Sequence, residues 1–121
     1  MTRSMTGVLL EFTAVGRPRD LAAAVEEHAQ RRRTLQAIVV PWESDAATLS
    51  MAVTSVNVDG WAIEHTNLGT IRLTDLGGGR TRVVITAHEP DHPQKERLLE
   101  LLDGFARQIQ TRFQADARPA D

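Results

Sequence analysis

The chain has 121 residues, of which 41% are hydrophobic and 25% are charged, and its formal net charge at pH 7 is −2. A chain of this length can bury enough apolar surface to fold as one domain without disulfides or a structural metal. The balance of 14 basic and 16 acidic residues argues against a general nucleic-acid-binding protein, which would be strongly basic. The lack of cysteine excludes a disulfide framework, a thiol nucleophile and a cysteine-ligated metal.

The sequence shows no targeting or membrane segment. The apolar residues Val8–Leu10 are followed directly by Glu11, which is too short a run for a secretory signal. No stretch approaches the roughly 18 apolar residues of a membrane span. We therefore expect a single cytoplasmic domain over residues 1–121 with a frayed tail at 116–121, and neither a nucleic-acid partner nor a membrane span.

The first half of the chain predicts a strand, a helix and two more strands. Apolar residues alternate with period two over 6–15, which is typical of a half-buried strand. A helical pattern then covers about 18–32, with Pro18 in its first turn. Compact or alternating apolar runs predict strands over 35–40 and 48–58.

Turn signals divide the middle of the chain. The apolar alternation changes phase at Thr54-Ser55, as a β-bulge would cause. Asp59-Gly60 is a pair that type I′ hairpin turns favour at their two central positions. Further turns are predicted at 67–69 and 77–79, and Gly77-Gly78-Gly79 fits a hairpin better than a phosphate loop. Separate strands are therefore expected over 61–66, 71–74 and 81–88.

The clearest element is an amphipathic helix that begins after Pro93. Its apolar residues recur at three- and four-residue spacing and form one long stripe: Leu98, Leu102, Phe105, Ile109 and Phe113. Asp91 and Gln94 fit a capping box before it. Gly104 costs about 1 kcal/mol relative to alanine inside a helix, so we expect it to allow the close approach of a neighbouring element.

Antiparallel strands followed by such a helix predict an α+β domain whose curved sheet of about six strands is covered by the long C-terminal helix. Three segments resemble the START-like superfamily of polyketide cyclase/dehydrase and lipid-transport proteins. They are Gly69-Thr70-Ile71-Arg72-Leu73, Gly78-Gly79-Arg80-Thr81-Arg82-Val83 and Phe105-Ala106-Arg107-Gln108-Ile109. The resemblance covers about residues 67–113 and implies the helix-grip fold. The family usually has two short helices after its first strand, whereas this sequence has one.

The resemblance implies a cavity between the sheet and the C-terminal helix that binds a hydrophobic small molecule or lipid, with no cofactor. The candidate ligand-binding residues are those expected to face this cavity: Trp61, Ile63, His65, Ile71, Leu73, Val83, Ile85, Phe105 and Ile109. The same residues also fit an ordinary hydrophobic core. His65 would be a polar group in an apolar cavity, able to orient a ligand or move a proton.

Two alternatives to simple binding stay open. One is a cyclase or dehydratase-type enzyme in which His65 acts as acid or base, with Glu64 or a bound water as helper. The other is a ligand-free interaction module that forms a homodimer through an exposed strand edge.

Three further groups of residues favour structural roles. The run from His88 to His92 straddles a strand-to-helix junction with two prolines, so it predicts a polar turn and not a metal site. Arg31 to Arg33 point around a helix and predict a solvated helix end. His28 on the first helix poses the same choice as His65, between a ligand-orienting histidine and one on the rim of the domain.

Overall fold

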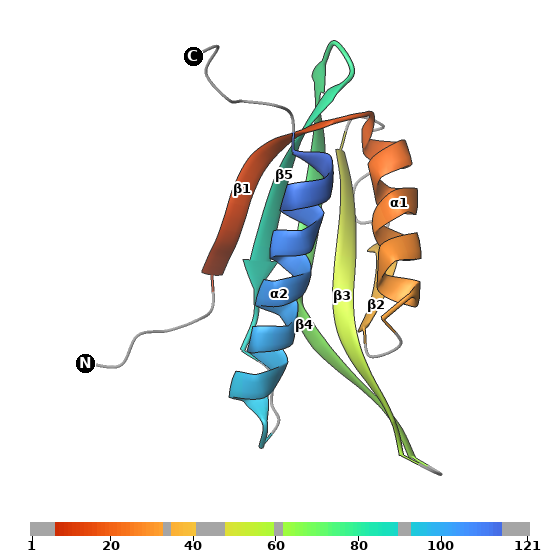
Figure 1. The fold of residues 1–121 in the computed structure, drawn as a ribbon, viewed down its shortest axis with the longest axis vertical. Coiled ribbons are helices and arrows are strands. Elements are labelled where there is room, and N and C mark those ends of the chain that lie inside the picture. The colour runs from red at the N-terminus through yellow and green to blue at the C-terminus, as the bar shows by residue number, and fades with distance from the viewer. Residues whose placement is uncertain (1–6, 33–34, 41–47, 60–61, 90–92, 115–121) are drawn as a thin grey trace, which may run out of the picture.

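A computed structural model describes residues 7–32, 35–40, 48–59, 62–89 and 93–114. Within these residues the chain forms five strands and two helices (Figure 1). In chain order they are β1 (Gly7–Val15), α1 (Pro18–Gln30), β2 (Leu35–Val40), β3 (Thr48–Asp59), β4 (Ala62–Gly77), β5 (Arg80–Ala87) and α2 (Lys95–Phe113). The expected tail at 116–121 lies outside the described residues.

The five strands form one antiparallel sheet in the order β1-β5-β4-β3-β2, which is open because its first and last strands do not pair. Both helices lie on one face of this sheet, side by side (Figure 1). Helix α1 contacts β2, β3 and β4, while α2 contacts β1, β4 and β5. The α+β class, the antiparallel sheet and the C-terminal helix are therefore as expected from the sequence, with five strands in place of about six.

The missing strand is explained by a β-bulge in β4. The turn expected at 67–69 is wrong, because β4 runs through these residues without a break. Val53 pairs with Gly69 and Thr54 pairs with Asn67, so Leu68 is an extra residue on β4. The Asn67 side-chain oxygen accepts a hydrogen bond from the Gly69 N–H at 3.0 Å. The asparagine and glycine that indicated a turn thus shape a bulge, which lets a strand bend and continue.

The bulge also accounts for the phase change expected at Thr54-Ser55. The pairing of β3 with β4 does shift there, between Val53 and Thr54, but the extra residue belongs to β4. Beyond the shift the two strands leave the rest of the sheet. Strand β2 pairs with β3 only as far as Ser55, and β5 pairs with β4 only from Gly69 onward. The far ends of β3 and β4 therefore pair only with each other, and we call residues 56–59 and 62–67 the β3–β4 ribbon.

The core lies between the sheet and the two helices. Phe105, Leu102 and Ile109 of α2 are fully buried, as is Val25 of α1. The strands contribute a layer of buried side chains opposite them: Phe12, Ala14, Leu35, Ala37, Met51, Val53, Ile71, Leu73, Val83, Ile85 and Ala87. Leu98 and Phe113, at the two ends of the predicted stripe, are only partly buried and pack against this core.

Hydrogen bonds join Gly16, between β1 and α1, to the β4–β5 turn. Gly78 and Gly79 have φ of +65° and +77°, which fits the predicted turn, since a two-residue type I′ hairpin needs positive φ at both positions. The Gly16 N–H donates to the Gly79 carbonyl oxygen at 2.7 Å. The buried Thr81 hydroxyl donates to the Gly16 carbonyl oxygen, also at 2.7 Å. The start of α1 is thereby held beside the hairpin.

Three local predictions need correction. Asp59 is the last residue of β3 and pairs with Ala62, so it is not a central turn residue; Gly60 lies outside the described residues. Gln94 is the N-cap of α2 and makes no side-chain capping bond, while Asp91 lies outside the described residues. Gly104 has open space where a Cβ would lie, so no neighbour approaches it closely.

Candidate functional site

Six of the nine candidate ligand-binding residues lie together between the sheet and the helices. Ile71 and Leu73 come from β4, Val83 and Ile85 from β5, and Phe105 and Ile109 from α2. Each is at most 2% exposed, and all belong to one hydrophobic cluster. These six candidates are therefore neighbours in the described structure, where they pack on one another as part of the core.

The other three candidates belong to or adjoin the β3–β4 ribbon. Trp61 lies outside the described residues. Ile63 pairs with Val58, and His65 pairs with Val56. Residues alternate between the two faces along β3, and directly paired residues share a face. Val56 and Val58 are an odd number of positions from Met51, the partner of Ile71, so the register puts positions 63 and 65 on the opposite face from position 71.

This change of face follows from the bulge. If Leu68 had taken its own place in a regular pairing with β3, the odd-numbered positions of β4 would all have fallen on the helix-covered face, as the sequence alternation indicated. Acid–base chemistry at His65 stays a prediction, and its position in the register separates it from the buried candidates of β4.

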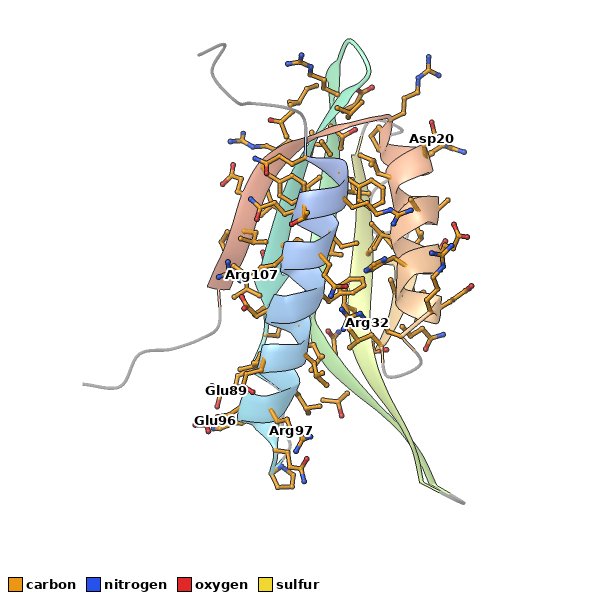
Figure 2. The ribbon with its side chains drawn as sticks, in the orientation of Figure 1. Asp20, Arg32, Glu89, Glu96, Arg97 and Arg107 are labelled. Atoms are coloured by element: carbon orange, nitrogen blue, oxygen red, sulfur yellow. The ribbon has the colours of Figure 1, made fainter. Side chains whose placement is uncertain are left out.

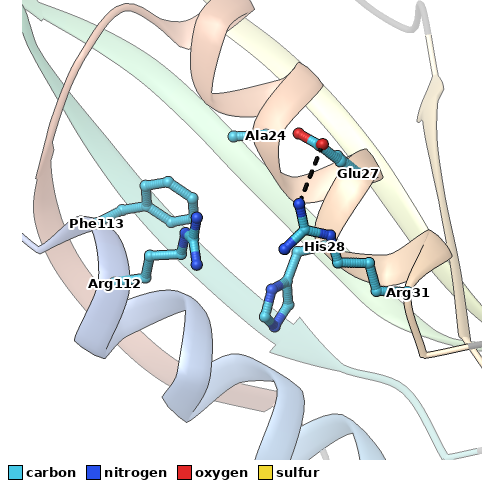
Figure 3. A pocket seen from close by; sticks show the side chains of 6 residues that line it. All are labelled: Ala24, Glu27, His28, Arg31, Arg112 and Phe113. Atoms are coloured by element: carbon cyan, nitrogen blue, oxygen red, sulfur yellow. Dashed lines mark hydrogen bonds and ion pairs between the residues drawn. The ribbon is translucent and has the colours of Figure 1, made fainter.

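Two hollows lie between α1 and α2, and His28 and Arg112 line both of them. The smaller has a volume of about 60 Å³ and is lined by Ala24, Glu27, His28, Arg31, Arg112 and Phe113 (Figure 3). The larger has a volume of about 320 Å³ and is lined by His28, Arg107, Gln108, Thr111 and Arg112. We call the larger one the interhelical groove.

His28 connects the interhelical groove to the core. Its ring lies 5.5 Å from the ring of Phe105, centroid to centroid, with an angle of 39° between the planes. Its Nε2 atom lies 3.0 Å from the Gln108 Oε1 atom, which makes a hydrogen bond between the two helices. His28 is also in the last turn of α1, where the helix dipole favours a positive charge. The structure thus gives His28 a defined interhelical role.

The arginines around the hollows differ in their partners. Arg31 pairs with Glu27 at 3.3 Å and Arg107 pairs with Asp103 at 3.0 Å, each within its own helix. The Arg112 guanidinium lies 5.7 Å from the centre of the Phe113 ring. Among the residues that the structure describes, no carboxylate pairs with Arg112.

A short ion pair joins Glu89, just after β5, to Lys95, the first residue of α2. Glu89 and Lys95 lie 2.6 Å apart, and this contact raises the pKa of Lys95 above its usual value. His88 is exposed, and His92 lies outside the described residues. In the described ranges no group of three or more histidine or acidic side chains is arranged to hold a metal ion.

The polar strip that lines the interhelical groove was missed by sequence reasoning. Residues 107, 108, 111 and 112 recur at a spacing of four and lie on the polar side of the amphipathic helix. Such a strip is normally solvated, and only the arrival of α1 beside it makes a groove. His28 was singled out from the sequence, but its hydrogen bond to Gln108 of α2 was not predicted.

Neither described helix is long and apolar enough to cross a bilayer. No protein-family model, no curated protein and no solved structure matched the chain.

Proposed function

We propose that the chain is a ligand-binding domain of the START-like, helix-grip type, which holds a hydrophobic small molecule or lipid between a curved sheet and α2. The sequence resemblance supplies the ligand class. The order of elements supports the proposal: a first strand at one edge, a helix, a run of antiparallel strands returning to pair with the first, and a C-terminal helix on the same face as the first helix.

The observation that carries the proposal is the interhelical groove, which we take as the opening of the site. The groove has a volume of about 320 Å³ and is wide open to solvent. His28 lines the groove and packs on Phe105, one of the buried candidates. A ligand in the groove would therefore rest on the edge of the same apolar cluster that the sequence predicted as its site.

The test combines mass spectrometry with a blocked variant. Native mass spectrometry of freshly purified protein should reveal a co-purified small molecule, and the uncharged apolar probe N-phenyl-1-naphthylamine should bind saturably. His28→Trp, which fills the groove, should weaken probe binding strongly. The matched control is His88→Trp, which changes an exposed histidine after β5 and should leave binding unchanged. Absence of saturable binding by the unaltered chain, or equal binding by both variants, would contradict the proposal.

A second candidate function, the homodimeric interaction module, has one observation in its favour, which concerns a face of the sheet and not the strand edge expected from the sequence. Within the described residues no helix covers the other face of the sheet, and one cross-strand row there consists of Ile38, Ala52, Thr70, Thr86 and Val8. Val8 is 62% exposed and Ile38 is 42% exposed. Light scattering would then show a dimer that Ile38→Lys converts to a monomer. A monomer at all concentrations would exclude this function.

A further inference from the structure

Every side chain that lines the interhelical groove can donate a hydrogen bond, and two of them are cations. Arg107 and Arg112 carry permanent positive charges, Gln108 has an amide, Thr111 has a hydroxyl and His28 has two ring nitrogens. No acidic side chain lines this groove, although the smaller hollow beside it includes Glu27. The groove is therefore complementary to a negatively charged group.

Several of these donors are still available for a ligand. Asp103 accepts from the Arg107 Nε atom, which leaves the two terminal nitrogens of that guanidinium. Gln108 uses its Oε1 atom toward His28, which leaves the amide nitrogen of Gln108 as a donor. Arg112 makes a cation–π contact with the Phe113 ring, and among the residues that the structure describes no carboxylate accepts from its N–H groups.

The helix dipoles explain part of this arrangement but not all of it. Arg112 is in the last turn of α2 and His28 in the last turn of α1, where positive charge is favoured. Arg107 is in the middle of α2, where the dipole has no such effect. The dipoles also do not require that these three side chains line one groove. In the smaller hollow, Arg31 lies near His28 and Arg112 (Figure 3).

We infer that the interhelical groove binds an oxyanion, either a carboxylate or a phosphate, which is the polar head of the small molecule that the chain holds. Arg112 and Arg107 supply the charge, and Gln108 and Thr111 supply neutral hydrogen bonds. The inference rests on the proposed function, because the apolar part of the same molecule would lie toward His28 and Phe105. The ligand is then an anionic amphiphile and not a neutral lipid.

The experiment measures the affinities of three probes that share one alkyl chain: octanoate, octyl phosphate and 1-octanol. Calorimetric titration should show that an anionic probe binds about tenfold or more tightly than the alcohol, since a hydrogen bond to a charged group is worth about 1.5–3 kcal/mol. Added salt should reduce this difference, because the groove is exposed. The stronger of the two anions identifies the head group.

Arg112→Gln should remove most of the preference for the anion, and Arg112→Lys should restore part of it, because the charge returns without the planar fork of donors. The matched control is Arg97→Gln, which changes an exposed arginine near the beginning of the same helix, away from Arg107 (Figure 2). The control should bind all three probes as the unaltered chain does. Melting temperatures should be alike for all variants, since both arginines are exposed.

The outcomes separate the inference from the function on which it rests. If Arg112→Gln loses the preference for anions and Arg97→Gln keeps it, both the oxyanion site and the ligand-binding function are supported. Equal binding of octanol and the anions, unchanged by Arg112→Gln, overturns the oxyanion site and leaves apolar binding in place. Equal weakening by Arg97→Gln overturns the site as well, because the attraction is then one of overall charge. No binding of any probe overturns both.

Discussion

At the scale of single residues, two glycines show how closely α2 approaches the sheet. A Cβ on Gly69 of β4 would overlap the Thr86 carbonyl oxygen and lie 3.1 Å from the Leu102 side chain of α2. A Cβ on Gly104 of α2 would have nothing within 4 Å. The close approach that the sequence suggested at a helical glycine is therefore made at a strand glycine, beside the bulge.

The two glycines should respond to alanine with opposite signs. Gly69→Ala should lower the free energy of unfolding by about 1–3 kcal/mol, because the added methyl group overpacks a site bounded by backbone. Gly104→Ala should raise it by up to about 1 kcal/mol, because alanine is the better helix former and no atom obstructs its methyl group. Urea denaturation measures both, and destabilisation by Gly104→Ala would contradict the described packing.

The Glu89–Lys95 pair should be visible in the titration of one resonance. Lys95 is the only lysine in the sequence, so its side-chain NMR signal is unique. The hydrogen bond and charge of Glu89 raise the pKa of Lys95, and the pair therefore stabilises the fold at and below the usual lysine pKa. This stabilisation is lost as the pH rises through the raised pKa of the folded state. Glu89→Gln should return the pKa toward its usual value, and an unchanged titration would disprove the contact.

At the scale of elements, α2 depends on the burial of its central face. Phe105 is fully buried against the sheet and His28, whereas Phe113 at the helix end is partly buried. Phe105→Ala should reduce the free energy of unfolding by about 3–5 kcal/mol, the usual cost of deleting a buried phenylalanine. Phe113→Ala is the control and should cost clearly less. Thermal or chemical denaturation compares the two variants. Equal losses in the free energy of unfolding would mean that α2 packs on the sheet through a different face.

Local patterns predicted the helices and most strands because their signals lie within a few residues. The stripe from Leu98 to Phe113 and the alternation of β5 required no knowledge of neighbours. In β1 the predicted alternation holds only from Leu10 onward, because a register shift between Val8 and Leu10 puts Val8 on the opposite face. Asn67 and Gly69 gave the same local signal for a turn and for a bulge. Only the pairing with β3 and β5 on both sides of β4 decides between them, and that pairing is not a local property.

The candidate site was predictable only in part, for the same reason. The buried residues of β4, β5 and α2 share a face by simple periodicity, so their grouping was expected. The hydrogen bond of His28 with Gln108 joins residues 80 positions apart, so the interhelical groove could not be derived from either segment alone. Ile63 and His65 were predicted on the face of Ile71 because the sequence does not show that Leu68 has no partner of its own on β3. This extra residue shifts the alternation for the positions before it.

At the scale of the whole molecule, stability should be distributed unevenly along the longest strands. The middle of β3 and β4 has neighbours on both sides and a helix-covered core. In the part of the chain that the structure describes, no further strand pairs with either edge of the β3–β4 ribbon. Two-stranded ribbons are marginally stable by themselves in water. Amide hydrogen exchange should therefore be faster at residues 56–59 and 62–67 than at 51–53 and 71–73. Equal protection would indicate that a partner or ligand covers the ribbon.

The extra residue Leu68 shifts the alternation of faces along β4 by one position. Each residue of a strand is assigned to a face by its parity, and the bulge changes that parity for every position from 62 to 67. Loss of the Leu68 codon would remove the bulge but leave Asn67 opposite Thr54, so positions 62–67 would keep their register and positions 63 and 65 would stay on the face opposite position 71. Loss or gain of residues in cross-strand pairs nearer the hairpin tip would shorten or lengthen the ribbon and keep its faces. Descendants of this chain can thus change the length of the ribbon, or lose the bulge, and still keep each position of the ribbon on its present face.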